Sequence, residues 1–213
     1  MVHMLSTHAL VGIHFTIYKV LEGLLIRKCL NGDTIFLIVG KSGAGKNSIC
    51  DRVENRLGAK QLESYTTRRP RFTHEKGHRF VWRYELWKAE HPDEQIVAET
   101  HFAGSDYWAT ATQIDEANTY IVDMAGVRRL RATYRGKKEI RVIYIKVSAL
   151  ERYLRMRRRG DSPRDAVKRL LHDHKAFRGV LKCSDVVICN KDFEDCCDDV
   201  ESYMLEEDGI CES

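Results

Sequence analysis

The sequence IFLIVGKSGAGKNSIC, residues 35–50, joins an apolar run to a glycine-rich turn and a lysine. The apolar run Ile35–Val39 predicts a short buried strand, and a helix is expected to begin soon after Lys46. The glycines let the backbone bend until several N–H groups point at one anion, and the positive end of the new helix attracts the same charge. Lys46 would reach the outer phosphates of a nucleotide. This order of strand, loop and helix predicts a phosphate-binding loop rather than an ordinary glycine turn.

The residue after this lysine departs from the usual motif. A serine or threonine normally stands there and its hydroxyl ligates magnesium, whereas this chain has Asn47, followed by Ser48. Asparagine offers a neutral carbonyl oxygen on a longer side chain, so direct ligation would push the ion outward. We therefore expect Asn47 to hold magnesium weakly, through a water molecule.

Residues 1–33, before the first strand, carry apolar residues at helical spacing: Leu10, Ile13, Ile17, Val20, Leu21 and Leu24. Charged residues interrupt this segment too often for a membrane span, and it lacks the basic start and cleavage site of a signal peptide. We expect an amphipathic extension that packs on this protein or on a twin subunit, as in a homodimer. A helix lying on a membrane surface is the alternative.

The composition is that of an ordinary globular protein. With 213 residues, 43% of them hydrophobic, the chain can bury one sizeable core. A net charge of +4 does not indicate a nucleic-acid partner. The seven cysteines include no CxxC pair, which argues against a disulfide framework and a structural zinc site. Thiols of this kind suit the reducing cytoplasm, where we expect the protein to act.

The segment SYTTRRPR, residues 64–71, is polar and rich in arginine, with a turn imposed at Pro70. Guanidinium groups bind phosphate oxygens through two hydrogen bonds at once, so Arg68 and Arg71 suit a second phosphate. Taken alone, the segment fits a basic surface loop equally well.

Apolar runs and helical stretches alternate over the rest of the chain. We expect helices over 48–57, from about 149 to 159, over about 163–177 and at the acidic end of the chain. Strands of a small sheet are expected at 79–84 and 95–102, and buried strands at 119–122, 140–147 and 185–189. This alternation predicts a parallel α/β domain. Asp123 ends one of the buried strands, where such sheets place ligands, and it is equally suited to cap the next helix.

These motifs, in this order, resemble those of the guanylate kinase family of P-loop nucleoside monophosphate kinases. GKSGAGKNS at 40–48 resembles the family's GPSGAGKST, and SYTTRRPR followed by Gly77 resembles its acceptor segment. DMAGV at 123–127 is similar to the family's D-x-x-G-V. RMRRRG at 155–160, together with KRL at 168–170, is similar to the lid motif of the family, and DVVICN at 185–190 is similar to its final strand. The likeness spans roughly residues 34–205, and five motifs in family order make it specific.

The resemblance implies a three-layer P-loop fold over residues 34–213 with a parallel core sheet. It also implies a small monophosphate-binding part at about 62–115 and a helical lid at about 155–170. The implied ATP site comprises Gly40, Ser42, Gly43, Ala44, Gly45, Lys46, Asn47, Ser48 and Asn190. The implied monophosphate site comprises Ser64, Arg68, Arg71, Phe80, Glu99, Tyr107 and Asp123. Lys46 and the lid residues Arg155, Arg159 and Arg169 would act on the phosphoryl group in transfer.

Three positions in the acceptor site depart from the family pattern. Phe80 stands where the family has a tyrosine hydroxyl that touches the acceptor phosphate. Trp108 and Ala109 replace a glycine and a hydroxyl residue after Tyr107, and Glu99 aligns only within a residue or so. Kinase chemistry is therefore expected, while recognition of guanine is the less supported part of the prediction.

The resemblance implies an enzyme of purine nucleotide metabolism that transfers the γ-phosphate of ATP to GMP, with magnesium. Two alternatives remain open: a kinase for another (deoxy)nucleoside monophosphate, or a guanylate-kinase-like scaffold that binds nucleotides without turnover. Retention of Lys46, Arg68 and Arg71 argues against a scaffold. A nucleic-acid-acting NTPase is disfavoured, because no hydrophobic run ends in paired acids.

Overall fold

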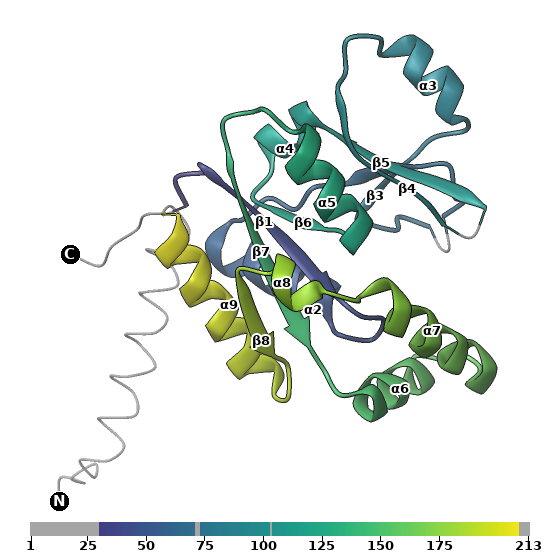
Figure 1. Cartoon of the computed structure of the whole chain (residues 1–213), viewed down its shortest axis with the longest axis vertical. Coiled ribbons are helices and arrows are strands. Elements are labelled where there is room, and N and C mark those ends of the chain that lie inside the picture. The colour runs from purple at the N-terminus through teal and green to yellow at the C-terminus, as the bar shows by residue number, and fades with distance from the viewer. Residues whose placement is uncertain (1–29, 71–72, 103, 209–213) are drawn as a thin grey trace, which may run out of the picture.

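A parallel sheet forms the centre of the molecule (Figure 1). The computed structural model describes residues 30–70, 73–102 and 104–208. The central strands run in the order β6 (Thr119–Ile121), β1 (Thr34–Gly40), β7 (Glu139–Lys146) and β8 (Val186–Cys189), all parallel. Every residue of β1 is buried, because the strand lies between two others and both its faces are covered. The predicted parallel α/β core is confirmed.

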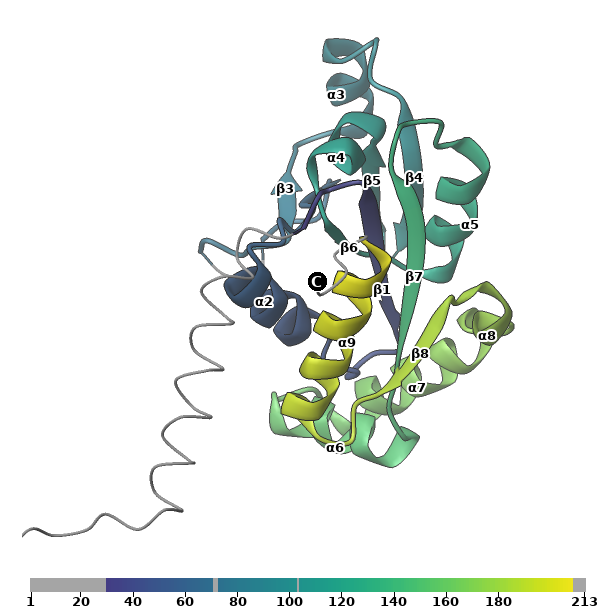
Figure 2. The same ribbon diagram turned by 90° about the vertical axis from the view of Figure 1, so that its left-hand side faces the viewer.

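Helices cover both faces of this sheet and make three layers. Figure 2 shows α2 (Lys46–Leu57) and α9 (Phe193–Glu207) on one side, with α5 (Met124–Thr133) and α8 (Val180–Cys183) on the other. The side chains of β1 alternate between the two cores: Phe36 and Ile38 pack toward α2 and α9, and Leu37 packs toward α5. The carboxyl end of β1 leads directly into the glycine-rich loop.

A second, smaller sheet stands beside the core. Its strands run in the order β3 (His78–Phe80), β2 (Ser64–Thr66), β5 (Ser105–Thr110) and β4 (Ile96–Phe102). Two short helices, α3 (Tyr84–Glu90) and α4 (Ala111–Glu116), follow β3 and β5. Helix α5 packs against β4, which attaches the small sheet to the core.

The strand predicted over residues 79–84 is wrong beyond Phe80, because Tyr84 begins a helix. In α3, the buried Trp87 packs against Tyr65 and Trp108, with ring centroids 4.7 and 5.2 Å apart. This burial of a large ring favours the helix over the alternating pattern of the local sequence. The other predicted elements among the described residues end within a few residues of the observed bounds.

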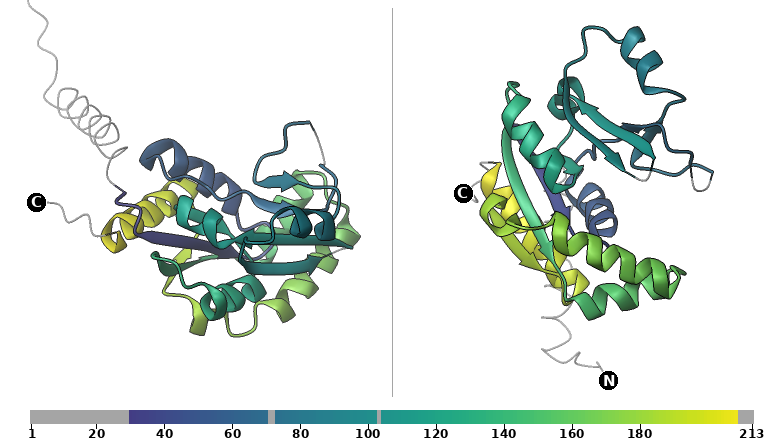
Figure 3. Two further views of the ribbon diagram at one scale, coloured as in Figure 1. Left: turned by 90° about the horizontal axis from the view of Figure 1, so that it is seen from above. Right: turned by 45° about the vertical axis from the view of Figure 1, so that its right-hand side comes forward.

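Two helices, α6 (Ala149–Arg158) and α7 (Pro163–Ala176), form the arginine-rich pair. Ser148 and Ser162 cap their first turns by accepting hydrogen bonds from backbone N–H groups three residues later. Figure 3 shows this pair and the small sheet projecting from the core on the same side. The glycine-rich loop that follows β1 therefore lies between the α6–α7 pair and the small sheet.

Two groups of predicted residues fall outside the described part of the chain. Residues 1–29 hold nearly all of the predicted amphipathic extension, so the extension and its homodimer remain predictions. Arg71 also lies outside the described residues. No helix in the described part has the length and apolar run that a membrane crossing needs.

Candidate active site

The glycine-rich loop is packed so closely that two of its glycines have no room for a side chain. Gly43 and Gly45 have φ angles of +79° and +92°, in the left-handed region. A Cβ atom on Gly43 would lie 2.9 Å from the carbonyl oxygen of Arg152, and one on Gly45 would lie 2.9 Å from Nδ2 of Asn190. Helix α2 begins directly after Gly45, at Lys46, while the backbone N–H of Ser42 donates to Asp173 and that of Ala44 donates to the carbonyl oxygen of Lys41.

Lys46 folds back over this loop. Its ammonium group donates a hydrogen bond to the carbonyl oxygen of Gly40, at 2.6 Å. Desolvation by burial lowers the pKa of Lys46 from 10.5 to about 8, against the opposing attraction of Asp173. A charge held in this state gains most from an arriving anion, because a phosphate would restore the interactions that burial removed.

A cavity of about 310 Å³ opens between the loop, the small sheet and α7. It brings together eight of the predicted site residues: Gly40, Ser42, Lys46, Ser64, Glu99, Tyr107, Asp123 and Arg169. His78, Thr100, His172 and Asp173 also line it, although the sequence had not indicated them. Lys46 and Arg169 line the cavity at the loop and α7 together with the carboxylate of Asp173, whereas the carboxylates of Glu99 and Asp123 line it near β4 and the start of α5.

Two residues of the segment 64–71, Ser64 and Arg68, make side-chain contacts with residues 75–80. Arg68 donates two hydrogen bonds to the carboxylate of Glu75, at 2.8 and 3.1 Å, and its guanidinium lies 5.4 Å from the centre of the Phe80 ring. The hydrogen bond that Arg68 donates to Glu75 is the chief cause that raises the pKa of Arg68. Ser64 Oγ lies 2.9 Å from Nδ1 of His78. Arg68 and Phe80 lie outside the lining of the cavity.

Two carboxylates stand at the other end of the cavity, each held by a protein donor. Glu99 forms an ion pair with Arg129 at 2.7 Å. Asp123 caps α5 by accepting a hydrogen bond from the backbone N–H of Gly126 at 2.7 Å, which confirms its predicted capping role. The hydroxyl of Thr100 donates to Asp123 as well, at 3.3 Å.

The arginine-rich helices are tied to the loop by an ion pair that the sequence did not reveal. Arg152 and Asp173, both almost fully buried, lie 3.0 Å apart. Asp173 also accepts a hydrogen bond from the backbone N–H of Ser42 at 2.8 Å. This one carboxylate therefore joins the loop, α6 and α7.

The predicted lid arginines are distributed over several sites. Arg155 donates to the carbonyl oxygen of Asn190 at 3.2 Å, beside Gly45, and Asn190 donates to the carbonyl oxygen of Ala44 at 2.9 Å. Arg159, half exposed, binds the carboxylate of Asp161 through two hydrogen bonds. Arg169 lies 3.6 Å from the same carboxylate and alone among the three lines the cavity.

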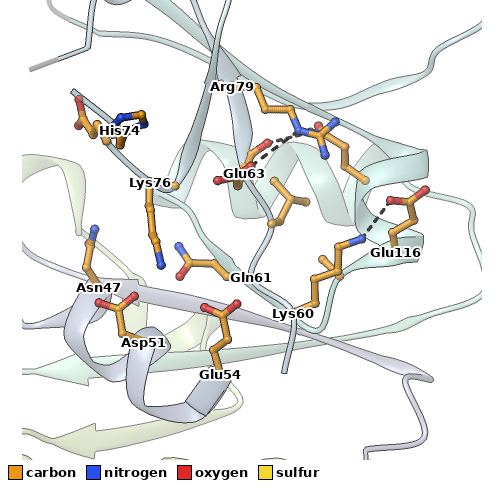
Figure 4. A pocket seen from close by; sticks show the side chains of 15 residues that line it. Asn47, Asp51, Glu54, Lys60, Gln61, Glu63, His74, Lys76, Arg79 and Glu116 are labelled. Carbon is orange, nitrogen blue, oxygen red and sulfur yellow. Dashed lines mark hydrogen bonds and ion pairs between the residues drawn. The ribbon is translucent and has the colours of Figure 1, made fainter. Parts of the chain in front are cut away.

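Asn47 faces a different space. It lines a larger cavity, of about 740 Å³, between α2 and the small sheet, where Figure 4 places it on the same helix face as Asp51 and across from Lys76. Ser48 is exposed beside it. Among the described residues, no group of three histidine, cysteine or acidic side chains is placed to hold a metal ion.

The protein can supply magnesium with few ligands of its own at the start of α2. The ion is commonly bound by one or two protein oxygens together with substrate phosphates and several waters. Asn47 and Ser48, at the exposed start of α2, lie outside the lining of the cavity that contains Lys46, so either would reach an ion bound to the phosphates through water. When bound with ATP, magnesium neutralises part of the charge on the outer phosphates.

The comparisons with known proteins agree with this geometry. The guanylate kinase family model matches residues 32–207. The guanylate kinase of Fusobacterium nucleatum subsp. nucleatum is 26% identical over 186 residues, which cover 83% of this chain and 97% of that protein. The crystal structure of guanylate kinase from Anaplasma phagocytophilum matches with a TM-score of 0.56 at 20% identity, over 83% of this chain and 86% of that one. The chain therefore belongs to the guanylate kinase family and is a nucleoside monophosphate kinase.

Proposed function

We propose that this kinase phosphorylates GMP, converting ATP and GMP to ADP and GDP with magnesium. The observation that supports it best is the cavity of about 310 Å³, which joins Lys46 and Ser64 to the carboxylates Glu99 and Asp123. The Watson–Crick edge of guanine carries N–H groups that can donate hydrogen bonds to a carboxylate. Adenine instead presents a ring nitrogen that accepts hydrogen bonds, and a carboxylate would repel it. The acidic end of the cavity is thus suited to guanine.

The reaction then depends on positioning and electrostatics. The loop 40–48 would hold the phosphates of ATP, and Ser64, Arg68 and Arg71 would hold the acceptor phosphate. Arg155, Arg159 and Arg169 would approach from the α6–α7 pair and stabilise the charge that develops on the transferred group. Closure of this pair would also exclude water, which would otherwise compete as the acceptor.

A panel of acceptors tests the proposal. ATP is combined with GMP, dGMP, IMP, AMP, CMP or UMP, and ADP release is followed in a coupled assay. We expect the highest kcat/KM with GMP, and a lower one with IMP, which lacks the exocyclic amine of guanine. A higher kcat/KM with AMP or a pyrimidine nucleotide would overturn the proposed base specificity.

Replacing Arg68 by alanine should raise the KM for the monophosphate far more than the KM for ATP. Loss of a bidentate, charge-assisted contact costs about 2–4 kcal/mol in kcat/KM. Initial rates with each substrate varied in turn measure the effect. Arg68→Lys is the matched control, since it keeps the charge and loses the planar fork of the guanidinium. Its KM for the monophosphate should lie between those of wild type and Arg68→Ala. Equal effects on both substrates would contradict the assignment.

Replacing Arg159 by alanine should lower kcat about 100-fold and leave the Kd of both nucleotides little changed, because the guanidinium would act mainly in the transition state. Single-turnover rates and equilibrium titration separate the two quantities. Arg158→Ala serves as the control, since Arg158 is 73% exposed and 3.8 Å from Glu151. Weaker binding with kcat retained would mean that Arg159 only attracts anions.

Replacing Asn47 by serine should leave kcat within about tenfold, roughly 1.4 kcal/mol, and lower the magnesium concentration needed for half-maximal activity. The serine hydroxyl can ligate the ion directly, whereas Asn47 is expected to do so through water. Activity titrated with magnesium for both proteins measures this. If the wild type were inactive at every magnesium concentration and Asn47→Ser restored turnover, the asparagine would have disabled the site.

A further inference from the structure

We propose that His78 binds the acceptor phosphate, together with Ser64. No motif in the sequence assigns this histidine a role, and it lies outside the arginine segment 64–71. The inference extends the proposed function by one binding residue, and it rests on that function for the position of the acceptor phosphate beside Ser64 and for the choice of GMP as the first test substrate.

The pairing of β2 with β3 places these two side chains side by side. Ser64 and His78 are direct partners in the parallel register, and Ser64 Oγ lies 2.9 Å from His78 Nδ1. Both side chains line the cavity that also contains Lys46 and Arg169. A phosphate bound between these cations and the small sheet would therefore meet the Ser64–His78 pair.

The pair presents a hydrogen-bond donor whichever way its protons are arranged. If the Ser64 hydroxyl donates to Nδ1, the neutral imidazole carries its proton on Nε2. If the imidazole is charged, Nδ1 donates to Ser64, the hydroxyl keeps its own proton, and Nε2 still carries one. In these two states Nε2–H can donate to a phosphate oxygen, and the charged state adds a favourable charge. In the remaining state, a neutral ring with its proton on Nδ1, the imidazole donates to Ser64 and the Ser64 hydroxyl keeps a proton that it can donate to the phosphate.

Two aromatic rings pack near the imidazole of His78 and restrict how it can turn. The ring of Tyr107 meets it edge-on, with centroids 5.5 Å apart, and the ring of Phe80 lies at 6.1 Å on the same face of β3. A donor that is already oriented loses less conformational entropy when the ligand arrives. Phe80 has no hydroxyl to offer from this strand, whereas His78 can supply a polar donor two residues earlier.

A purely structural histidine is the rival explanation, and the two differ in what they predict for a ligand that lacks the phosphate. A structural role would support the whole wall of the cavity, so its loss would weaken GMP and guanosine alike. If His78 binds the phosphate, its loss should weaken the binding of GMP and leave the binding of guanosine unchanged. Guanosine therefore serves as the matched ligand control.

The test compares wild type with His78→Phe, which keeps an aromatic ring and removes both nitrogens. We expect the Kd of GMP to rise about 20-fold, in line with loss of a hydrogen bond to a charged group, and the inhibition constant of guanosine to change less than twofold. The Kd of ATP should also stay constant. His78→Gln, which retains an N–H donor, should recover part of the GMP affinity.

Equal losses for GMP and guanosine, or no loss for either, would overturn the proposal. Thermal melting of each variant shows whether it is folded, and His78→Gln provides the comparison if His78→Phe is not. If wild type rejects GMP, the proposed base specificity fails, and the same comparison is made with the monophosphate it accepts and the matching nucleoside. An error in the proposed role of His78 and an error in the proposed base specificity therefore give different results.

Discussion

Replacement of Lys46 by methionine is expected to lower kcat about 1,000-fold while raising the free energy of unfolding near pH 7. The catalytic loss follows from removing a positive charge that would otherwise contact the transferred phosphoryl group. The gain in stability follows from burial, which lowers the pKa of this lysine from 10.5 to about 8. Methionine fills a similar volume without a charge to desolvate. Steady-state kinetics and urea unfolding measure the two effects.

The pH dependence of stability gives this prediction a definite sign. Between pH 8 and 10.5 the unfolded lysine is protonated and the folded one is largely neutral, so the unfolded state binds more protons and stability rises with pH. Below pH 8 the full cost of the buried charge, on the order of 3 kcal/mol, is present. Lys46→Met lacks this term, so its advantage over wild type should shrink from pH 7 to pH 10.

Lys60 provides the matched control for this experiment. It is exposed on the surface and pairs with Glu116 at 3.2 Å, so its replacement by methionine should change neither kcat nor the pH profile beyond experimental error. If Lys46→Met lowered stability at pH 7, the hydrogen bond to Gly40 would outweigh the cost of desolvation. The conformation of the glycine-rich loop would then depend on the hydrogen bond from Lys46 to Gly40.

The parts of the site that could be predicted from sequence are those whose geometry is local. The turn at Gly43 and Gly45 and the position of Lys46 depend on a few consecutive residues, so one motif contains the information. Asp123 is a second example, since a carboxylate before an apolar helical stretch satisfies N–H groups three residues away. The alternation of apolar runs likewise predicts the parallel sheet.

Residues whose roles depend on strand register or on distant partners could not be predicted in this way. His78 meets Ser64 only because β2 and β3 pair in one particular register, and a shift of one residue would turn its side chain to the opposite face. The ion pair of Glu99 with Arg129 joins β4 to α5, and nothing in the spacing of either residue indicates it. These contacts arise from tertiary packing.

Arginines illustrate the same limit within a single helix. The stretch after Ser148 contains five arginines, at 152, 155, 157, 158 and 159, and the sequence does not tell which of them is buried. The structure buries Arg152 against Asp173 and leaves Arg158 in solvent. An acid twenty-one residues later in the chain, on the next helix, decides between them.

Replacing Arg152 by alanine is expected to destabilise the fold by about 3–5 kcal/mol, which is the usual cost of removing one partner of a buried ion pair. The Arg152 and Asp173 side chains are 5% and 6% exposed, so water cannot replace the lost guanidinium. Urea unfolding measures the change. Arg158→Ala is the control and should cost less than about 0.5 kcal/mol, because its pair is exposed.

The same substitution should affect the loop, because Asp173 also holds the backbone N–H and the hydroxyl of Ser42. An uncompensated Asp173 carboxylate would stand beside the predicted phosphate-binding loop, so we expect the Kd of ATP to rise as stability falls. Arg152→Met combined with Asp173→Asn removes both charges while the asparagine can still accept from Ser42. The double variant should therefore recover most of the lost stability. If it remained as unstable as Arg152→Ala, packing of the arginine stem rather than the buried charge would hold α6 and α7 on the loop.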